Sequence, residues 1–385
     1  MHIAECSDSF VPVVDGVGRV VNQYACWLAL RGHECYVITP LQNTGYRGSF
    51  PFEILDFTSL DVPTAPQYQT GIALLDRHYL DRLAMVSLDI MHVHSPGFSG
   101  VEGLRLADKL NIPVVGTFHS KYREDVRRIT HSNALASLGS HYVAQFYERC
   151  NEVWAVSEDA AMTLRSYGFR NAISVVQNGT EMRTPAPQLE IEARERLLLG
   201  QDPIFLYVGQ IDYKKNLPLV IDAAALLKKR GHSFQLVFAG QGRDKKRLAD
   251  LAEERGLDQI TFVGHISNRN LLDGLYMAAS LFVFPSLYDT AGLVVREAAV
   301  MGTPSVVVEN TAPAEVVTDG VNGLICSNNP ESLCRAMEHY LFEMSKDERA
   351  DIRKQAQSSI PLPWDEVMAD VEARYMTIIA NAKRS

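Results

Sequence analysis

Short apolar segments, each followed by a glycine-containing turn and then by an amphipathic helix, recur along the whole chain. The first series begins with residues 2–6 and a glycine turn at 16–18, and a second series restarts at 204–208. A buried parallel strand appears in sequence as a continuous apolar run, and it needs a crossover, usually a helix, to reach the next strand. The pattern therefore predicts α/β architecture with parallel sheets. At 385 residues the chain is too long for one ordinary core, so we expect two domains.

Between residues 181 and 201 this pattern gives way to two prolines and a charged run, which we interpret as the interdomain linker. The predicted boundaries are residues 1–183, residues 184–363, and a C-terminal amphipathic helix within 364–385. Two such domains, each directing strand ends and glycine turns into a shared cleft, would suit a nucleotide-diphosphate ligand.

Composition excludes several classes of protein. A net charge of −9 gives no basic footprint for nucleic acid. The six cysteines are scattered without a C-x-x-C pair, which predicts a reducing, cytoplasmic environment. The first strand starts at residue 2, so we expect no signal peptide, and no apolar run is long enough to span a bilayer. Contact with a membrane surface stays compatible with these features.

The segment from residue 281 to 304 combines a buried strand, a turn and the start of a helix. Pro285 stops the strand, the turn holds Asp289, and Gly292 opens a helix that carries Glu297 roughly two turns in. A strand end, a glycine turn and a helix N-terminus together present backbone N–H groups to an anion. This predicts a ligand site with a carboxylate near each end; the alternative is an ordinary βα unit with solvated carboxylates.

Two other turns have the same character. Lys214 and Lys215 precede a helix N-terminus, where positive charge opposes the helix dipole unless an anion neutralises it. Gly16 lies in the turn of residues 13–18, where the backbone could approach a phosphate or a sugar. Solvated lysines and a plain tight turn are the alternatives.

Three histidines follow the strands of the first series. His119 ends the strand of residues 112–119, at the sheet edge where ligands of open α/β sheets bind, so it is a candidate site residue. His92 and His94 share one face of the preceding strand. No third ligand is spaced to join them, so we predict packed or hydrogen-bonded histidines and no metal site.

Residues 120–149 interleave arginines and lysine with aromatic and apolar side chains. Such a surface could face an anionic membrane or a charged acceptor. Glu124 and Asp125 weaken the signal, and an ordinary solvated helix explains the segment equally well.

Taken together, these segments resemble the retaining glycosyltransferases of family 4 (glycosyl transferases group 1), which have the GT-B fold, over nearly the whole chain. Each motif is weak alone, but their order and spacing are specific. The motifs of the first half are GVGRVV (16–21), LRGHE (30–34), DIMHVH (89–94), PVVGTFH (113–119) and VQNG (176–179). Those of the second half are YVG (207–209), KN (215–216), GQG (240–242), FVG (262–264), PS (285–286), GLVVREA (292–298), GTP (302–304) and DGVNGL (319–324).

The resemblance implies two Rossmann-like domains facing each other across a cleft. Residues 1–183 would bind the acceptor, residues 184–363 the nucleotide sugar, and the helix of residues 364–385 would pack back on the first domain. In the donor site, Gly16 would lie under the pyrophosphate or sugar, Lys215 would neutralise phosphates, and Ile266 would lie near the base. Glu297 would accept the ribose hydroxyls. Sugar hydroxyls and a phosphate would bind the backbone N–H groups of Ala291, Gly292, Leu293 and Val294.

His119 and Asp289 would be the catalytic pair at the transferred sugar. The family pattern has a glutamate where this chain has Asp289, an aromatic residue where it has Ala291, and an arginine where it has Gln210. Asp289 is one methylene shorter than glutamate, and the missing arginine leaves Lys215 as the main cation for the phosphates, with Lys214 as a possible helper. We interpret these departures as marks of a subfamily.

The implied reaction is transfer of a hexose from a nucleotide-diphosphate sugar, UDP-glucose being the first expectation, to an acceptor hydroxyl with retention of configuration. The leaving phosphate would help to deprotonate the acceptor, and no cofactor or essential metal is expected. The acceptor would be a membrane lipid at the inner face of the membrane, a cell-envelope glycan or a small molecule. Two alternatives stay open: a GT-B sugar-nucleotide epimerase, and a nucleotide-binding protein without transferase activity.

Overall fold

The structure is a computed structural model that describes residues 1–11, 15–41, 48–62 and 65–384. The chain divides into two compact units, which we call unit 1 (Met1–Gly179 with Trp364–Ser385) and unit 2 (Thr180–Pro363). The boundary lies at residue 180 instead of the expected 184, because the intervening residues bond within unit 2. The Thr180 N–H donates to the Leu362 carbonyl at 2.6 Å, and Arg183 pairs with the buried Asp273.

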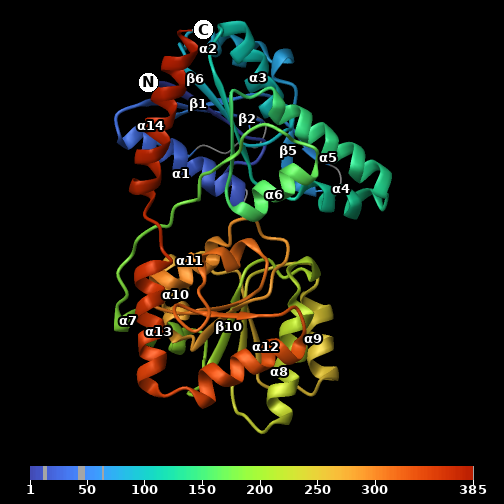
Figure 1. The fold of residues 1–385 in the computed structure, drawn as a ribbon, viewed down its shortest axis with the longest axis vertical. Coiled ribbons are helices and arrows are strands. Elements are labelled where there is room, and N and C mark those ends of the chain that lie inside the picture. Colours follow the sequence, from blue (N-terminus) through green and yellow to red (C-terminus); the bar gives the residue numbers. More distant parts are fainter. Residues whose placement is uncertain (12–14, 42–47, 63–64, 385) are drawn as a thin grey trace. The chain divides into compact units, whose positions relative to one another are not determined.

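Unit 1 is built on a seven-stranded sheet in the order β3-β2-β1-β6-β7-β8-β9, all parallel (Figure 1). Most of its strand residues are fully buried, as expected for a sheet covered by helices. The strands are β1 (His2–Cys6), β2 (Glu34–Thr39), β3 (Glu53–Asp56), β6 (Ile90–Val93), β7 (Val114–Phe118), β8 (Glu152–Ala155) and β9 (Ser174–Val175). A separate antiparallel pair consists of β4 (Leu60–Val62) and β5 (Ala65–Thr70).

The helices of unit 1 follow from capping and apolar spacing. Asp15 caps the first helix by accepting from the Gly18 N–H at 2.7 Å, and Val20, Val21, Tyr24 and Leu28 form its buried face. The helices are α1 (Gly16–Leu30), the 3-10 turn η2 (Ala73–Leu75), α2 (Arg77–Leu83), α3 (Phe98–Leu110), α4 (Tyr122–Thr130), α5 (Asn133–Glu148), α6 (Glu158–Ser166) and α14 (Trp364–Ala382).

The C-terminal helix α14 returns to unit 1 and packs against α1, as predicted (Figure 1). Arg31 at the end of α1 donates to Glu372 at 2.8 Å and to Asp365 at 2.8 Å. The ring of Trp364 meets Tyr24 edge-on with 5.8 Å between centroids. The last segment of the chain is therefore part of the core of the first unit.

Unit 2 contains a six-stranded parallel sheet in the order β12-β11-β10-β13-β14-β15. In both sheets the first strand lies in the interior. The next strands are added on one side of it, and the chain then returns to add the remaining strands on the other side. This is the Rossmann arrangement, in which ligands bind at the point where the strand order reverses. The reversal falls between β1 and β6 in unit 1 and between β10 and β13 in unit 2. The strands are β10 (Ile204–Val208), β11 (Gln235–Ala239), β12 (Ile260–Gly264), β13 (Leu281–Phe284), β14 (Ser305–Val308) and β15 (Leu324–Cys326).

The helices of unit 2 cover this sheet and enclose an apolar cluster to which five of the strands contribute, with β12 (Ile260–Gly264) packed against it. They are α7 (Pro187–Arg196), η3 (Tyr213–Lys215), α8 (Leu217–Lys229), α9 (Lys245–Glu254), α10 (Arg269–Ala278), α11 (Leu293–Val300), η4 (Ala312–Val316), α12 (Pro330–Glu338), the π-helical turn η5 (His339–Glu343) and α13 (Lys346–Ser359). In the part of the chain that the structure describes, no helix is both long and apolar enough to cross a bilayer.

The interpretation of residues 181–201 as a linker was wrong. Helix α7 occupies most of this segment and packs closely against α10. The contact needs glycine at 274, because a Cβ there would lie 2.0 Å from the Leu189 carbonyl oxygen. Arg194 adds a bond to the Ala278 carbonyl at 3.1 Å. The charged run is therefore the solvent face of a docked helix whose apolar contact is narrow.

Candidate functional site

The reversal point of the unit 2 sheet brings Lys215 and Asp289 together. Lys215 ends η3, which follows β10, and Asp289 lies in the turn after the neighbouring strand β13. Lys215 Nζ is 2.7 Å from Asp289 Oδ1, and the two side chains are 12% and 25% exposed. Two residues that the sequence analysis placed at a ligand site independently are thus one ion pair.

The turns around this pair are held by their own polar groups. Asp212 accepts from the Lys214 N–H at 3.0 Å and starts η3. Asn216 ends it in the left-handed conformation, with φ of 60°, and donates to the Pro285 carbonyl at 3.1 Å. The loop after β10 is therefore tied to the loop after β13, which fixes Lys215 beside Asp289.

Asp289 is ionised at neutral pH. Burial raises its pKa, but the charge and hydrogen bond of Lys215 outweigh this and hold the pKa below its ordinary value. Its second oxygen, Oδ2, is buried and has no hydrogen-bond partner of acceptable geometry among the described residues, although the Ser286 side chain lies near enough to the carboxyl to help lower its pKa. A buried carboxylate oxygen without a donor is unusual in a folded protein and indicates that a ligand supplies one.

The N-terminus of α11 follows Asp289 directly. Gly292 precedes the helix in the left-handed conformation, with φ of +56°, and no side chain caps this end. A Cβ at Gly292 would also approach Pro313 to 3.1 Å. The turn therefore leads through Ala291 into an uncapped helix N-terminus at Leu293 and Val294, with glycine required by its conformation, and anion binding there stays a prediction.

Glu297 lies further along α11 and contacts a different set of residues. It is 5% exposed, with Arg269 Nη2 at 3.4 Å and the Tyr276 hydroxyl at 3.4 Å, both from α10. The sequence analysis did not single out Arg269. Ile266 is half-buried in the turn between β12 and α10, where Asn268 caps the helix by accepting from the Leu271 N–H at 3.0 Å.

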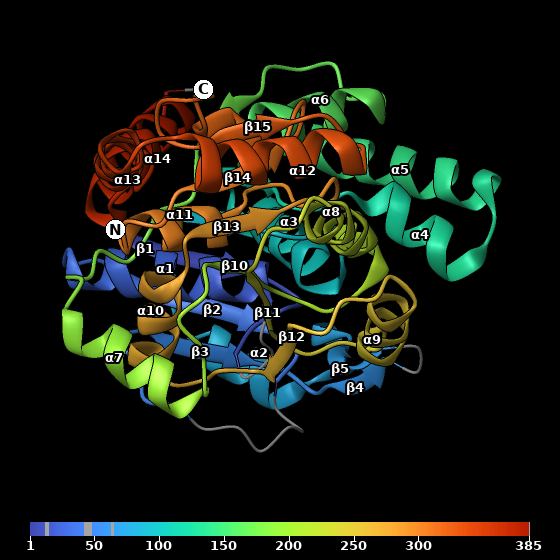
Figure 2. The ribbon, with the colours of Figure 1, turned by 90° about the horizontal axis from the view of Figure 1, so that it is seen from below.

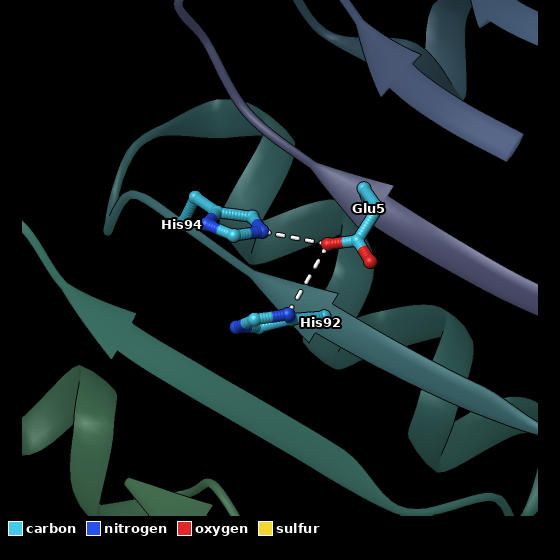
Figure 3. A group of neighbouring side chains, drawn as sticks. All are labelled: Glu5, His92 and His94. Atoms are coloured by element: carbon cyan, nitrogen blue, oxygen red, sulfur yellow. Dashed lines mark hydrogen bonds and ion pairs between the residues drawn. The ribbon is translucent and has the colours of Figure 1, made fainter. Parts of the chain in front are cut away.

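In unit 1, the reversal point of the sheet holds a buried polar cluster of Glu5, His92 and His94 (Figure 3). All three are 0% exposed. Glu5 Oε2 is 2.6 Å from His94 Nε2 and 3.2 Å from His92 Nδ1. The reason given above for excluding a metal, that no third ligand is near the histidines, was wrong, because β1 supplies Glu5. The absence of a metal stays a prediction.

His119 extends this cluster toward the end of β7. It is 5% exposed, and its Nε2 lies 2.9 Å from His94 Nδ1. Burial lowers the pKa of His119 well below its ordinary value, and the neighbouring histidines lower it further. Gly16, by contrast, is exposed at the start of α1, and a Cβ there would meet nothing within 4 Å. Residues 13 and 14 of the predicted glycine turn lie outside the described residues.

Acidification is expected to destabilise unit 1 between pH 6.5 and pH 4. Burial lowers the pKa of His94 from 6.5 to about 4, so within this window the unfolded chain binds a proton that the folded chain does not. Stability therefore falls as pH falls, by on the order of 3 kcal/mol from His94 alone. The three tryptophans of the chain, Trp27, Trp154 and Trp364, all belong to unit 1, so tryptophan fluorescence in urea reports this unit.

A His94→Gln variant is the control, because it should show a shallower loss of stability over the same range. Equal urea midpoints for the wild-type protein at both ends of the window would contradict the burial of a neutral histidine. Below pH 4.5 a second loss should follow, because the pKa of Glu5, although raised by burial, is held by the two histidines at about 2.

Two family models together match almost the whole chain. Residues 14–183 match Glycosyltransferase Family 4, and residues 190–359 match Glycosyl transferases group 1. The chain belongs to glycosyltransferase family 4. The resemblance inferred from the motifs is thereby confirmed, and the protein is a glycosyltransferase of the class that uses nucleotide sugars.

Two relatives illustrate the range of this family. The α-monoglucosyldiacylglycerol synthase of Streptococcus pneumoniae is 25% identical over 84% of this chain and 75% of its own length. The GDP-mannose-dependent α-mannosyltransferase of Corynebacterium glutamicum is 24% identical over 100% of this chain and 91% of its own.

Solved structures of GT-B glycosyltransferases match over the full chain. The sucrose-phosphate synthase of Thermosynechococcus elongatus superposes with a TM-score of 0.80 at 21% identity, covering 98% of this chain and 99% of the other. Anabaena HepE in complex with UDP-glucose superposes with a TM-score of 0.76 at 17% identity, covering 98% and 100%. The family 4 enzyme described here thus has the predicted GT-B fold class.

Proposed function

We propose that this enzyme transfers glucose from UDP-glucose to a lipid hydroxyl with retention of the anomeric configuration. The observation that carries the donor site is the Lys215–Asp289 pair at the reversal point of unit 2, with Asp289 Oδ2 buried and without a partner among the described residues. A cation, a carboxylate in need of a donor and an uncapped helix N-terminus are what a sugar diphosphate requires.

Each group has a role in this proposal. Lys215 neutralises the diphosphate, and Asp289 Oδ2 accepts from a hydroxyl of the sugar. The N–H groups at the start of α11 bind the distal phosphate and the sugar. Glu297 accepts from the ribose hydroxyls, and Ile266 packs against the base. Gly16 leaves room for the pyrophosphate, because no atom of its own unit lies where a side chain at this position would be.

The chemistry is positioning and electrostatic stabilisation. The bond from the anomeric carbon to the diphosphate breaks as the acceptor oxygen attacks the same face, and a phosphate oxygen takes the acceptor proton. Lys215 and the α11 N–H groups stabilise the charge that develops on the departing diphosphate. His119 contacts the transferred sugar. We propose that no essential metal is needed, since the lysine supplies the countercharge.

UDP-glucose is favoured over other donors by two comparisons. HepE is solved with UDP-glucose, and the pneumococcal relative is named for a glucosylated lipid. The corynebacterial relative is named for GDP-mannose, so GDP-mannose, which differs in both base and sugar, is the main competing donor. Retention is favoured because both relatives are named for α-linked activities, and the glucosyl bond of UDP-glucose is itself α.

A lipid acceptor is supported by the α4–α5 pair, which extends away from the sheet of unit 1 (Figures 1 and 2). Helix α4 has no buried residue. Its arginines Arg123, Arg127 and Arg128 are exposed. Large apolar side chains are exposed on the same pair: Ile129 at 58%, Leu135 at 49%, Leu138 at 66% and Tyr142 at 49%. Apolar side chains flanked by arginines suit the surface of an anionic membrane, at its cytoplasmic face.

The direct test is product analysis with UDP-glucose or GDP-mannose and anionic vesicles that contain diacylglycerol. We expect an α-glucosyl lipid with UDP-glucose only, at the same rate after EDTA treatment. A product with GDP-mannose would overturn the donor, and a β-linked product would overturn retention. Isomerised nucleotide sugar without vesicles would indicate an epimerase. Nucleotide binding by thermal shift without turnover on any acceptor would indicate a binding protein.

A further inference from the structure

A continuous hydrogen-bonded chain runs from the first strand of the protein to His119. Glu5 on β1, His94 after β6 and His119 after β7 are linked at 2.6 Å and 2.9 Å, and none is more than 5% exposed. Buried polar groups cost stability unless each is paired, so an arrangement of this depth needs a reason beyond packing.

We propose that Glu5 and His94 are positioning residues that hold the ring of His119 in a single tautomer, with the proton on Nε2. The inference rests on the proposed function in one respect only, namely that His119 contacts the transferred sugar. The tautomer itself follows from the hydrogen bonds.

The proton positions follow in three steps from the carboxylate outward. An ionised carboxylate only accepts hydrogen bonds, so the proton between Glu5 and His94 must be on His94 Nε2. A neutral His94 then has an unprotonated Nδ1, which only accepts. His119 Nε2 must therefore donate to it, and a neutral His119 has its lone pair on Nδ1.

The surroundings favour an ionised Glu5 and neutral rings of His94 and His119. Despite burial, the two histidines lower the pKa of Glu5 to about 2, which keeps the carboxylate ionised. Burial lowers the pKa of His94 to about 4, and that of His119 is also lowered, so both rings are neutral near pH 7. Other titratable groups near the cluster are His92, Tyr375, Tyr24 and the thiols of Cys6 and Cys35.

A bound metal ion explains the distances within the cluster less well than hydrogen bonds do. Two ligands of a tetrahedral zinc at about 2.05 Å would lie about 3.3 Å apart. Glu5 Oε2 and His94 Nε2 are closer, at 2.6 Å, the distance of a charge-assisted hydrogen bond. His92 has both ring nitrogens engaged, with the Tyr375 hydroxyl at 2.5 Å and Thr117 Oγ1 at 2.7 Å.

The tautomer of His119 fixes the direction of its hydrogen bond to the sugar. A His119 ring locked in this way can meet a sugar hydroxyl only as an acceptor, through Nδ1, and never as a donor. Tyr375 of α14 donates to Glu5 Oε1 at 3.3 Å, which is not the oxygen that contacts His94. Glu5 therefore acts on the sugar through His94 and His119 without touching it.

The test is nitrogen NMR of the protein labelled in its histidine rings, with a His119→Asn variant to identify the His119 signals. In the wild-type protein, His119 is expected to be protonated on Nε2 and His94 on Nε2. Glu5→Gln can donate as well as accept, so it should produce a mixture or the reverse tautomer at both rings. The matched control is Tyr375→Phe, which removes a hydroxyl from the same cluster and should keep the wild-type tautomers.

Kinetics provide the second readout. Glu5→Gln should lower kcat on the order of ten- to hundredfold while the Kd for UDP stays unchanged, because Lys215 and Glu297, the charged side chains assigned to the nucleotide, are in unit 2. Tyr375→Phe should lose thermal stability only. A wild-type His119 protonated on Nδ1, or Glu5→Gln with unaltered tautomers, would overturn the proposal. Expected tautomers without any turnover would instead overturn the proposed function and leave the positioning result standing.

Discussion

Lys215→Ala is expected to lower kcat/KM for the sugar nucleotide by roughly 10²- to 10³-fold, the usual effect of removing one group that stabilises transition-state charge. Lys215 is partly buried at 12% exposure and ion-paired, so it is held in place before a ligand arrives. The resemblance implies an arginine in the preceding turn, where this chain has Gln210, and this leaves fewer cations to compensate. Steady-state rates and calorimetric titration of UDP measure the loss.

Lys214→Ala is the matched control for this prediction. Both lysines lie near the ring of Tyr288, with Nζ at 4.7 Å and 5.4 Å from its centroid, but the ion pair to Asp289 belongs to Lys215. We expect less than a tenfold effect from the control. Comparable losses in the two variants would mean that general positive charge, and not the positioned cation, is what the donor needs.

A second control separates ligand contact from structural damage. Lys215→Ala leaves the carboxylate of Asp289 without its cation, which itself destabilises the turn. The double variant Lys215→Ala with Asp289→Asn removes that stranded charge. If the double variant recovers the binding of UDP, then the loss in the single variant came from the aspartate. We expect recovery of thermal stability without recovery of affinity.

Where polar residues come directly after apolar strands, the sequence was sufficient to place them. Lys215 and Asp289 were both assigned to a ligand site because each follows a buried strand and a turn. Their contact was not predicted, because it depends on β10 and β13 being neighbours although β11 and β12 intervene in sequence. The Rossmann strand order would have supplied that adjacency.

Glu5 was missed for a related reason. It lies inside a five-residue strand that otherwise looks like ordinary core, and its partners are almost ninety residues away. Parallel pairing of β1 with β6 places Glu5 directly beside His92 in register. The available signal was a carboxylate in a strand too short and apolar to leave it in solvent, since buried acids are rare unless paired.

Helix α7 was missed for a different reason, because its charged local sequence was interpreted as a linker. Half of its residues are charged, and Ala193 is the one that the structure buries fully. The small side chain lets α7 approach Gly274 of α10 closely, so a narrow contact suffices. Apolar periodicity cannot detect a helix that docks through its backbone and an alanine.

Glu297→Gln is expected to weaken UDP binding by roughly ten- to hundredfold, the equivalent of about 1.5–3 kcal/mol for hydrogen bonds to a charged acceptor. Glu297 is 5% exposed and lies near Arg269 and Tyr276, so the substitution keeps the shape of a well-packed side chain. The amide retains one acceptor oxygen but replaces the other with a donor, and it loses the charge. Two ribose hydroxyls can no longer both donate to it.

The sharpest measurement compares UDP with its 2′-deoxy and 3′-deoxy analogues in both proteins. In the wild-type enzyme, each missing hydroxyl that Glu297 accepts should reduce affinity. In Glu297→Gln the same omissions should matter much less, because the partner has already been weakened. Tyr276→Phe is the control, since it removes a distant hydroxyl from the same carboxylate and should leave the discrimination intact. Equal discrimination by the wild-type protein and Glu297→Gln would mean that the ribose is recognised elsewhere and that Glu297 serves its contact with Arg269.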